Sequence, residues 1–190
     1  MVNQKTRRMV MAALLAALTT AATMVIRIPT PTLGYIHLGD SMVLICGILL
    51  GPGLGAAAAG IGSMPADLFS GFTAWAPGTF AIKALTALVG GSLYRLCLKR
   101  EHISPPLRVI LCGIPAEAVM VAGYFLYEVG MMALAGSDLS AAAMAVLAGV
   151  PFNVVQGLTG IVVGVVLLPV LSHAGAGAEM PSRRRKSHNF

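Results

Sequence analysis

The residues in this sequence that could do chemistry are a few polar side chains inside long apolar segments. Lys83 and Glu117 stand well within two of these segments, and Asp67 and Arg27 stand near the ends of two others. An ionisable side chain at mid-membrane costs about 2.5–3.5 kcal/mol on insertion scales, so such a residue is by default a functional candidate. The chemistry expected of so small a set is recognition of a small molecule.

Neutral polar and aromatic residues fall at a similar depth. Counted at about 1.5 Å per helical residue, nearly all lie toward the side that the charge pattern below assigns to the outside. Aromatic faces, a few hydrogen-bonding groups and an apolar wall are what a small-molecule pocket needs. We therefore predict a cavity open to the outside, roofed by outer loops. Its predicted lining is His37, Asp40, Asp67, Trp75, Thr79, Lys83, Glu117, Tyr124, Asn153 and Gln156.

Several candidates have plainer interpretations, which the sequence leaves open. Lys83 and Glu117 could neutralise each other, and Asp67 could cap a helix or pair with Arg27. Trp75, like other outer aromatic residues, could belong to the interfacial belt. Asn153, just after Pro151, could be a helix-start residue, because Asn favours that position.

Motifs for covalent or metal catalysis are missing from the sequence. There is no GxxxxGK[ST] loop for ATP, no HExxH and no GxSxG. The three cysteines form no CxxC pair and no pattern with histidine. We predict a binding protein or conduit that is not an enzyme and carries no metal or cofactor.

Composition places the binding residues in a membrane. Hydrophobic residues make up 57% of the 190 and charged residues 11%, against about 25% charged in a soluble domain. Apolar runs near 20 residues recur, which is the length that crosses the hydrocarbon. A soluble fold of this size could not hide them all.

The net charge of +6 gathers at the ends of apolar runs rather than on one face. All but two of the thirteen basic residues lie in 5–8, 95–108 and 183–186. This is the positive-inside pattern, so both termini and the 99–108 loop are expected in the cytoplasm. Aromatic residues do not alternate with these basic residues, so nucleic acid is not an expected partner.

An even number of crossings follows, with four before the basic loop. Gly51-Pro52-Gly53 is a strong turn signal that divides the stretch 41–71 into two spans. We predict an all-α, six-helix membrane bundle in one domain, 1–190, with a basic tail at 174–190 and a possible short interfacial helix after residue 140. The predicted spans are 9–28, 40–50, 54–70, 77–98, 107–133 and 151–171.

Small residues form two stripes on the first span. Ala13, Ala17 and Ala21 repeat every four residues, and Ala12 and Ala16 form a neighbouring row. Small residues let another helix approach closely. Either row could pack inside this bundle or against another protein.

Local motifs over most of the chain resemble the substrate-binding S components of energy-coupling factor (ECF) importers. The branch that it resembles is the one assigned to vitamin B6-like and hydroxymethylpyrimidine-like substrates. The resemblance is strongest over 9–91. It rests on Ile-Pro-Thr-Pro at 28–31, Gly-Tyr-Ile-His-Leu-Gly-Asp at 34–40, Gly-Pro-Gly-Leu-Gly at 51–55, Gly62, Asp-Leu-Phe-Ser-Gly at 67–71, Ala-Pro-Gly-Thr at 76–79 and Ile-Lys at 82–83.

This resemblance implies a division of labour in a bacterial plasma membrane. The S component captures a water-soluble vitamin from outside and docks through alanines of its first span onto a transmembrane T component. Two cytoplasmic ATPases bind the ATP. A proton-coupled secondary transporter that uses Glu117, Lys83 and Asp67 as relay groups is the main alternative, although six spans without repeats fit it less well. A membrane scaffold would leave the polar cluster unexplained.

Overall fold

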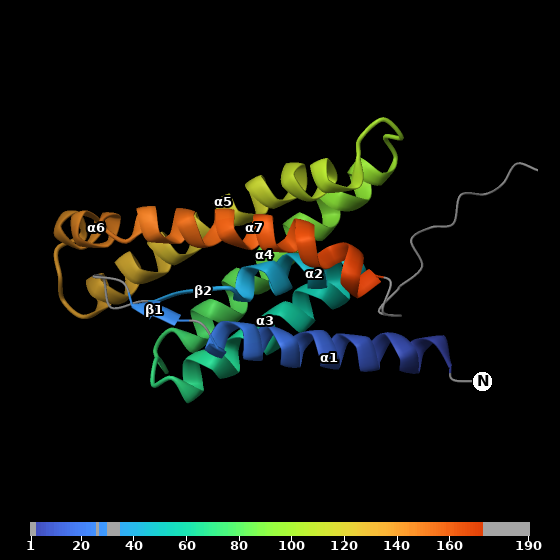
Figure 1. Ribbon diagram of the computed structural model, residues 1–190. Helices are drawn as coiled ribbons and strands as arrows, with labels where there is room; N and C mark the ends of the chain where they lie inside the picture. Colours follow the sequence, from blue (N-terminus) through green and yellow to red (C-terminus); the bar gives the residue numbers. More distant parts are fainter. Residues whose placement is uncertain (1–2, 26, 30–34, 173–190) are drawn as a thin grey trace, which may run out of the picture.

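The computed structural model describes residues 3–25, 27–29 and 35–172, and within them the chain is a helical bundle with one small hairpin (Figure 1). The predicted tail at 174–190 lies outside the described residues. The elements are α1 (Gln4–Val25), β1 (Arg27–Pro29), β2 (Tyr35–His37), α2 (Gly39–Leu50), α3 (Pro52–Phe69), α4 (Ala76–Leu98), α5 (Pro105–Leu134), α6 (Leu139–Leu147) and α7 (Val150–Leu171).

Four of the described helices are long and apolar enough to cross a membrane: α1, α4, α5 and α7. They lie close to the predicted spans, as with Ala76–Leu98 for 77–98 and Val150–Leu171 for 151–171. The helix α2 has only 12 residues, and α3 has 18 and follows it directly. The short helix α6, after residue 138, begins where the Asp138 carboxylate accepts hydrogen bonds from two backbone N–H groups.

Gly51 forms the joint between α2 and α3. Its φ is +84°, a left-handed conformation that glycine adopts without strain. A β-carbon there would lie 1.9 Å from the Arg95 guanidinium, which occupies that space. The break predicted from Gly51-Pro52-Gly53 is therefore a turn in the structure, and Pro52 begins the next helix, where its missing N–H costs nothing.

The predicted first span, 9–28, is too long at its carboxyl end. The helix α1 ends at Val25, and Arg27–Pro29 pairs antiparallel with Tyr35–His37. Pro29 explains the difference, because a residue before proline is pushed toward extended backbone. In Figure 1 the hairpin lies at the same end of the bundle as α6, and the first turn of α1 and the α4–α5 connection lie at the other end.

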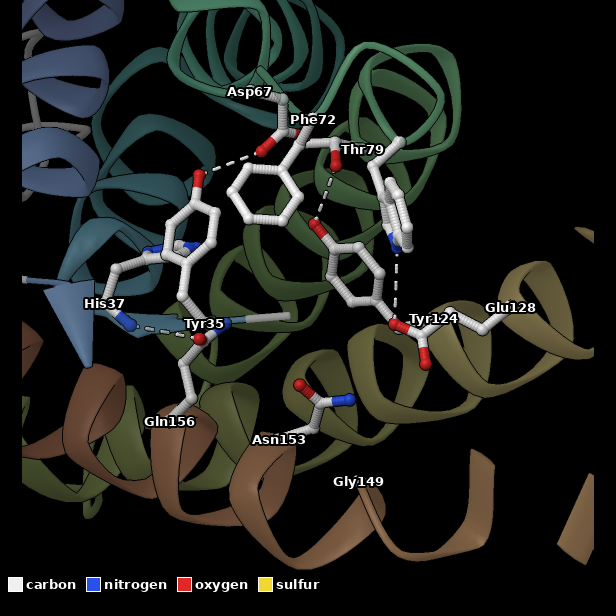
Figure 2. A pocket seen from close by; sticks show the side chains of 11 residues that line it. Tyr35, His37, Asp67, Phe72, Thr79, Tyr124, Glu128, Gly149, Asn153 and Gln156 are labelled. Carbon is white, nitrogen blue, oxygen red and sulfur yellow. Dashed lines mark hydrogen bonds between the residues drawn. The ribbon is translucent and has the colours of Figure 1, made fainter. Parts of the chain in front are cut away.

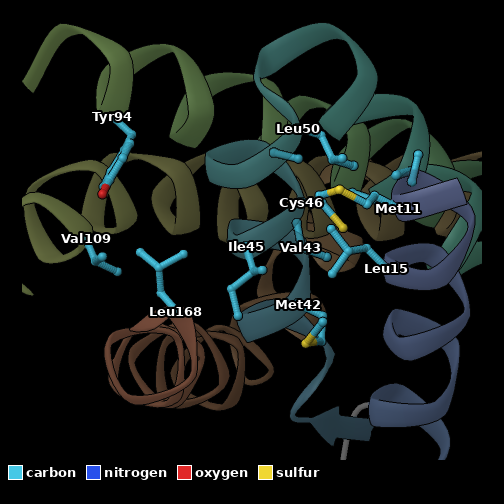
Figure 3. Close-up of a cluster of buried hydrophobic side chains, with 14 of the residues drawn as sticks. Met11, Leu15, Met42, Val43, Ile45, Cys46, Leu50, Tyr94, Val109 and Leu168 are labelled. Carbon is cyan, nitrogen blue, oxygen red and sulfur yellow. The ribbon is translucent and has the colours of Figure 1, made fainter. Parts of the chain in front are cut away.

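The core centres on α2, which has neighbours on every side. The helices α1, α3, α4 and α7 all pack against it, and Val43, Ile45 and Cys46 are fully buried among their side chains (Figure 3). A β-carbon on Gly47 would lie 2.2 Å from a backbone oxygen of α4, so glycine lets these two helices touch. Large apolar side chains of the long helices remain exposed on the outside, as expected for a protein whose solvent is lipid.

Candidate binding site

A cavity lies at the end of the bundle that carries the hairpin. The space left free between its side chains is about 40 Å³. The hairpin, the α3–α4 connection, α5 and α7 all contribute to its walls (Figure 2). Its lining residues are Tyr35, His37, Asp67, Phe72, Trp75, Thr79, Tyr124, Glu128, Gly149, Asn153 and Gln156.

Aromatic rings form much of the wall. The ring of Phe72 lies 5.1 Å from that of Tyr35 and 5.8 Å from that of Trp75, centroid to centroid, and the second pair is edge to face. Tyr124 faces this group from α5 (Figure 2). These tilted and edge-to-face contacts are favourable ring geometries, which hold the faces in place before a ligand arrives.

Polar groups of the wall are partly satisfied by one another. The Tyr35 hydroxyl donates to Oδ1 of Asp67 at 2.9 Å, and the hydroxyls of Thr79 and Tyr124 are 3.0 Å apart. The side chain of Asn153 makes no hydrogen bond to any residue that the structure describes, and its amide points into the cavity in Figure 2. That amide is available to a ligand as both donor and acceptor.

His37 presents a neutral ring to the cavity. Burial, together with the nearby Lys83 charge, lowers the pKa of His37 to about 4, so the imidazole is uncharged at neutral pH. Its Nδ1 accepts a hydrogen bond of 3.0 Å from the Gly39 N–H. The proton is therefore on Nε2, and His37 can offer one N–H donor.

A buried ion pair lies beneath the cavity. Lys83 and Asp40 are both fully buried, and the Lys83 ammonium binds Oδ1 of Asp40. The Gln156 amide donates to Oδ2 of Asp40 at 2.6 Å and accepts the His37 backbone N–H at 3.1 Å. The Lys83 ammonium also lies 5.0 Å from the centroid of the Tyr124 ring. This network joins α2, α4, α7 and the hairpin.

The structure gathers seven of the ten predicted lining residues around this one cavity. Asp40 and Lys83 lie below it and bind each other, because Asp40 stands in the first turn of α2 and not in an outer loop. Glu117 lines an apolar groove between α5 and α7 instead, and neither of its carboxyl oxygens has a hydrogen-bond partner among the described residues. Whether the seven bind substrate stays a prediction. They are His37, Asp67, Trp75, Thr79, Tyr124, Asn153 and Gln156.

Two of the pairings considered from sequence are absent from the described part of the chain. Lys83 binds Asp40 rather than Glu117. Arg27 donates to the Ser70 hydroxyl and stacks on the Tyr35 ring at 5.7 Å, and no ion pair joins it to Asp67.

Comparison with known proteins places this architecture in a family. Residues 3–173 match the family described as "ECF-type riboflavin transporter, S component". The chain belongs to this family. The match confirms the resemblance to S components, which are the substrate-binding subunits of transporters and not a class of enzymes, and it makes the chain a multi-pass membrane protein.

Two further similarities support the assignment. A protein of Pyrococcus woesei, described as "Uncharacterized protein in gap 3'region", is 32% identical over 146 residues, which are 76% of this chain and 88% of that protein. A solved structure, "Structure and mechanism of the S component of a bacterial ECF transporter", matches with a TM-score of 0.65 and 21% identity. It covers 90% of this chain and 98% of that one. At that identity the match shows the S-component fold alone.

Four lining residues of this S component are outside the predicted set. Tyr35 stands in the Gly-Tyr-Ile-His motif at 34–37, beside the predicted His37. Phe72 follows the Asp-Leu-Phe-Ser-Gly motif directly, so that motif was the available signal. Glu128 is one turn beyond Tyr124 on α5, and the i, i+4 spacing could have placed both on one face. Gly149 has no side chain, and no local signal marks it.

The structure separates the two alanine rows of α1. Ala12 is buried, and the backbone of Ala16 touches α3, where a β-carbon on Gly62 would lie 2.5 Å from the Ala16 oxygen. Ala13, Ala17 and Ala21 are exposed, on a row about 100° further around the helix. Of the five predicted docking residues, only Ala13, Ala17 and Ala21 are exposed to another protein.

Proposed function

We propose that this S component captures a water-soluble vitamin or vitamin precursor, B6-like or hydroxymethylpyrimidine-like, from outside the cell for ATP-driven uptake. The observation that carries the proposal is the cavity at the hairpin end of the bundle. It combines aromatic walls with an uncommitted amide at Asn153 and an N–H donor at His37. Apolar walls with a few placed polar groups are typical of ligand sites.

The free space of the cavity favours a small ligand over a large one. About 40 Å³ is free between its side chains, less than the clefts of about 300–1,000 Å³ that hold drug-sized ligands, so a vitamin would have to displace side chains of the wall. A single aromatic ring with short substituents requires less displacement than the three fused rings and long side chain of riboflavin. Riboflavin remains a second candidate because the family description names it.

The proposed topology has six crossings, made by α1 to α5 and α7, with both termini in the cytoplasm. It is supported by the separation of the two ends in Figure 1. The cavity lies at one end, and Arg8, Arg95 and Arg108 belong to helix segments at the other, as the positive-inside rule requires. The cavity then opens to the outside of a bacterial plasma membrane.

The proposed partners are a T component and two cytoplasmic ATPases, with docking through Ala13, Ala17 and Ala21. A proton-driven carrier has less support. Its relay would need Glu117, Lys83 and Asp67 in contact, but Lys83 is bound to Asp40 and Glu117 has no hydrogen-bond partner within the described residues.

Mass spectrometry of small molecules that copurify with the protein tests the proposal first, and titration calorimetry with the identified compound follows. We expect binding near 1:1 without ions or ATP. Asn153→Ala should weaken it about tenfold, in line with loss of a hydrogen bond in a desolvated site. Asn3→Ala, an exposed asparagine at the far end, is the matched control. Binding that requires a proton gradient would favour the carrier instead.

A further inference from the structure

Two carboxyl groups line the cavity without a lysine or arginine in its wall, Asp67 from the end of α3 and Glu128 from α5. Asp67 is only 6% exposed, and its Oδ2 has no hydrogen-bond partner among the described residues. Among the described residues, the one donor to Glu128 is the Trp75 indole at 3.5 Å, which is long for a hydrogen bond.

The nearby basic side chains are committed elsewhere. Lys83 is in the ion pair with Asp40. Arg27 lies over the Tyr35 ring and donates to Ser70. His37 is neutral because its pKa is about 4. Of the residues that line the cavity, none is a lysine or an arginine.

The aromatic walls act in the same direction as the carboxylates. The faces of tryptophan, tyrosine and phenylalanine rings carry negative potential and attract cations within about 6 Å. Trp75 and Phe72 line this cavity with no lysine or arginine of the described residues over their rings, whereas the Tyr35 and Tyr124 rings already have Arg27 and Lys83 nearby. A buried carboxylate with a free oxygen is costly until a donor reaches it, and a cationic ligand would supply that donor.

Two helix amino termini at the cavity oppose the binding of a cation, because helix amino termini attract anions. They belong to α4 and α7, and each helix has a proline as its second residue, Pro77 and Pro151, which has no N–H to give. The first N–H groups of α7 are also used locally, since Phe152 and Asn153 donate to the Gly149 oxygen. A terminus carries about half a charge, which is less than either whole carboxylate.

We infer that the ligand of this cavity is an aromatic heterocycle that bears a protonated amino group, and that phosphorylated forms are rejected. The ammonium is placed between Asp67 and Glu128, and the ring lies against the aromatic walls. The inference rests on the proposed function, because it names the charge of the ligand bound at that same site.

A matched series of probes tests it by titration calorimetry on the whole purified protein. Pyridoxamine, pyridoxine and pyridoxamine 5′-phosphate share one ring and differ in the amine or the phosphate. Riboflavin is the larger neutral probe. Within the matched set, the amine without phosphate is expected to bind about tenfold or more tightly than its neutral or phosphorylated counterpart, since a charge-assisted hydrogen bond is worth at least that factor.

Variants show whether the two carboxylates are responsible. Asp67→Asn and Glu128→Gln should each weaken binding of the best amine probe about tenfold and change binding of its neutral counterpart much less. Glu101→Gln, an exposed acid in the connection between α4 and α5, is the matched control. Amine affinity that is unchanged in both folded variants would overturn the inference.

The probe series stays decisive if a variant fails to fold. Tightest binding of riboflavin, pyridoxine or a phosphorylated probe would overturn the inference and leave the proposed vitamin capture intact. Absence of binding to every probe would overturn both the inference and the proposed substrate class.

Discussion

Replacing Lys83 by methionine is expected to destabilise this S component strongly. The change keeps much of the side-chain volume but removes the ammonium that binds Asp40. Both side chains are fully buried, with 0% of their surface accessible. Removing one partner of a buried pair costs about 3–5 kcal/mol, because the other charge stays buried and uncompensated. Among the described residues, the Asp40 carboxylate would keep only its bond to Gln156.

Thermal unfolding of the detergent-purified protein measures this loss. At roughly 2–4 °C per kcal/mol for a chain of this size, the expected fall in Tm is about 6–20 °C. The double variant Lys83→Met with Asp40→Asn should recover most of the loss, since asparagine leaves no charge behind and can still bind Gln156. Lys99→Met, at an exposed lysine, should change Tm by little.

Comparing the single and double variants tests whether Lys83 and Asp40 are buried and coupled. A Lys83→Met protein with wild-type Tm would mean that the pair is not buried as described. A double variant that is as unstable as the sum of the two single variants would mean that the side chains act independently. Ligand affinity should follow the same order, because Gln156 links the pair to the His37 backbone at the cavity.

Three other substitutions test separate parts of the structure. Ala13→Leu with Ala17→Leu should preserve ligand affinity and abolish uptake in cells that contain the partner subunits, and lost binding would show that the row packs internally. Gly62→Ala should cost about 1–3 kcal/mol in thermal unfolding, because its β-carbon meets a backbone oxygen of α1, whereas Gly53→Ala in the same helix meets nothing and should be neutral. Glu117→Gln should leave calorimetric affinity unchanged, and a tenfold loss would return Glu117 to the binding site.

The helices could be predicted from the sequence because their signals are local. Apolar length places a helix, and proline or glycine ends it, so Gly51-Pro52-Gly53 was sufficient to divide α2 from α3. The hairpin could not be predicted in this way. Its strands have three residues each and no alternating pattern, and their pairing joins Arg27 to His37 across the intervening segment.

The sequence predicted the depth of the site in the membrane but not the contacts within it. Counting residues along each helix brought seven of the ten candidates to one cavity. The choice of partner for Lys83 depended on packing, which no count supplies. Asp40 reaches it from the first turn of α2, where a β-carbon on Gly160 of α7 would lie 2.9 Å from that of Asp40. Glu117 packs against Gly157, one turn earlier on α7. Its candidate partner, Lys83, binds Asp40 instead.

The two alanine rows of α1 show what packing adds to a periodicity argument. Successive residues of an α-helix are about 100° apart, so the row of Ala12 and the row of Ala13 cannot face the same neighbour. The helix α3 packs against the row of Ala12 and Ala16. Gly62 lets the Ala16 backbone approach, and the Thr20 hydroxyl donates to the Gly62 oxygen at 2.6 Å. The exposed row then remains as the one place on α1 where small residues have no partner inside this bundle. Since close approach is what small residues provide in a membrane, a docking partner is expected at Ala13, Ala17 and Ala21.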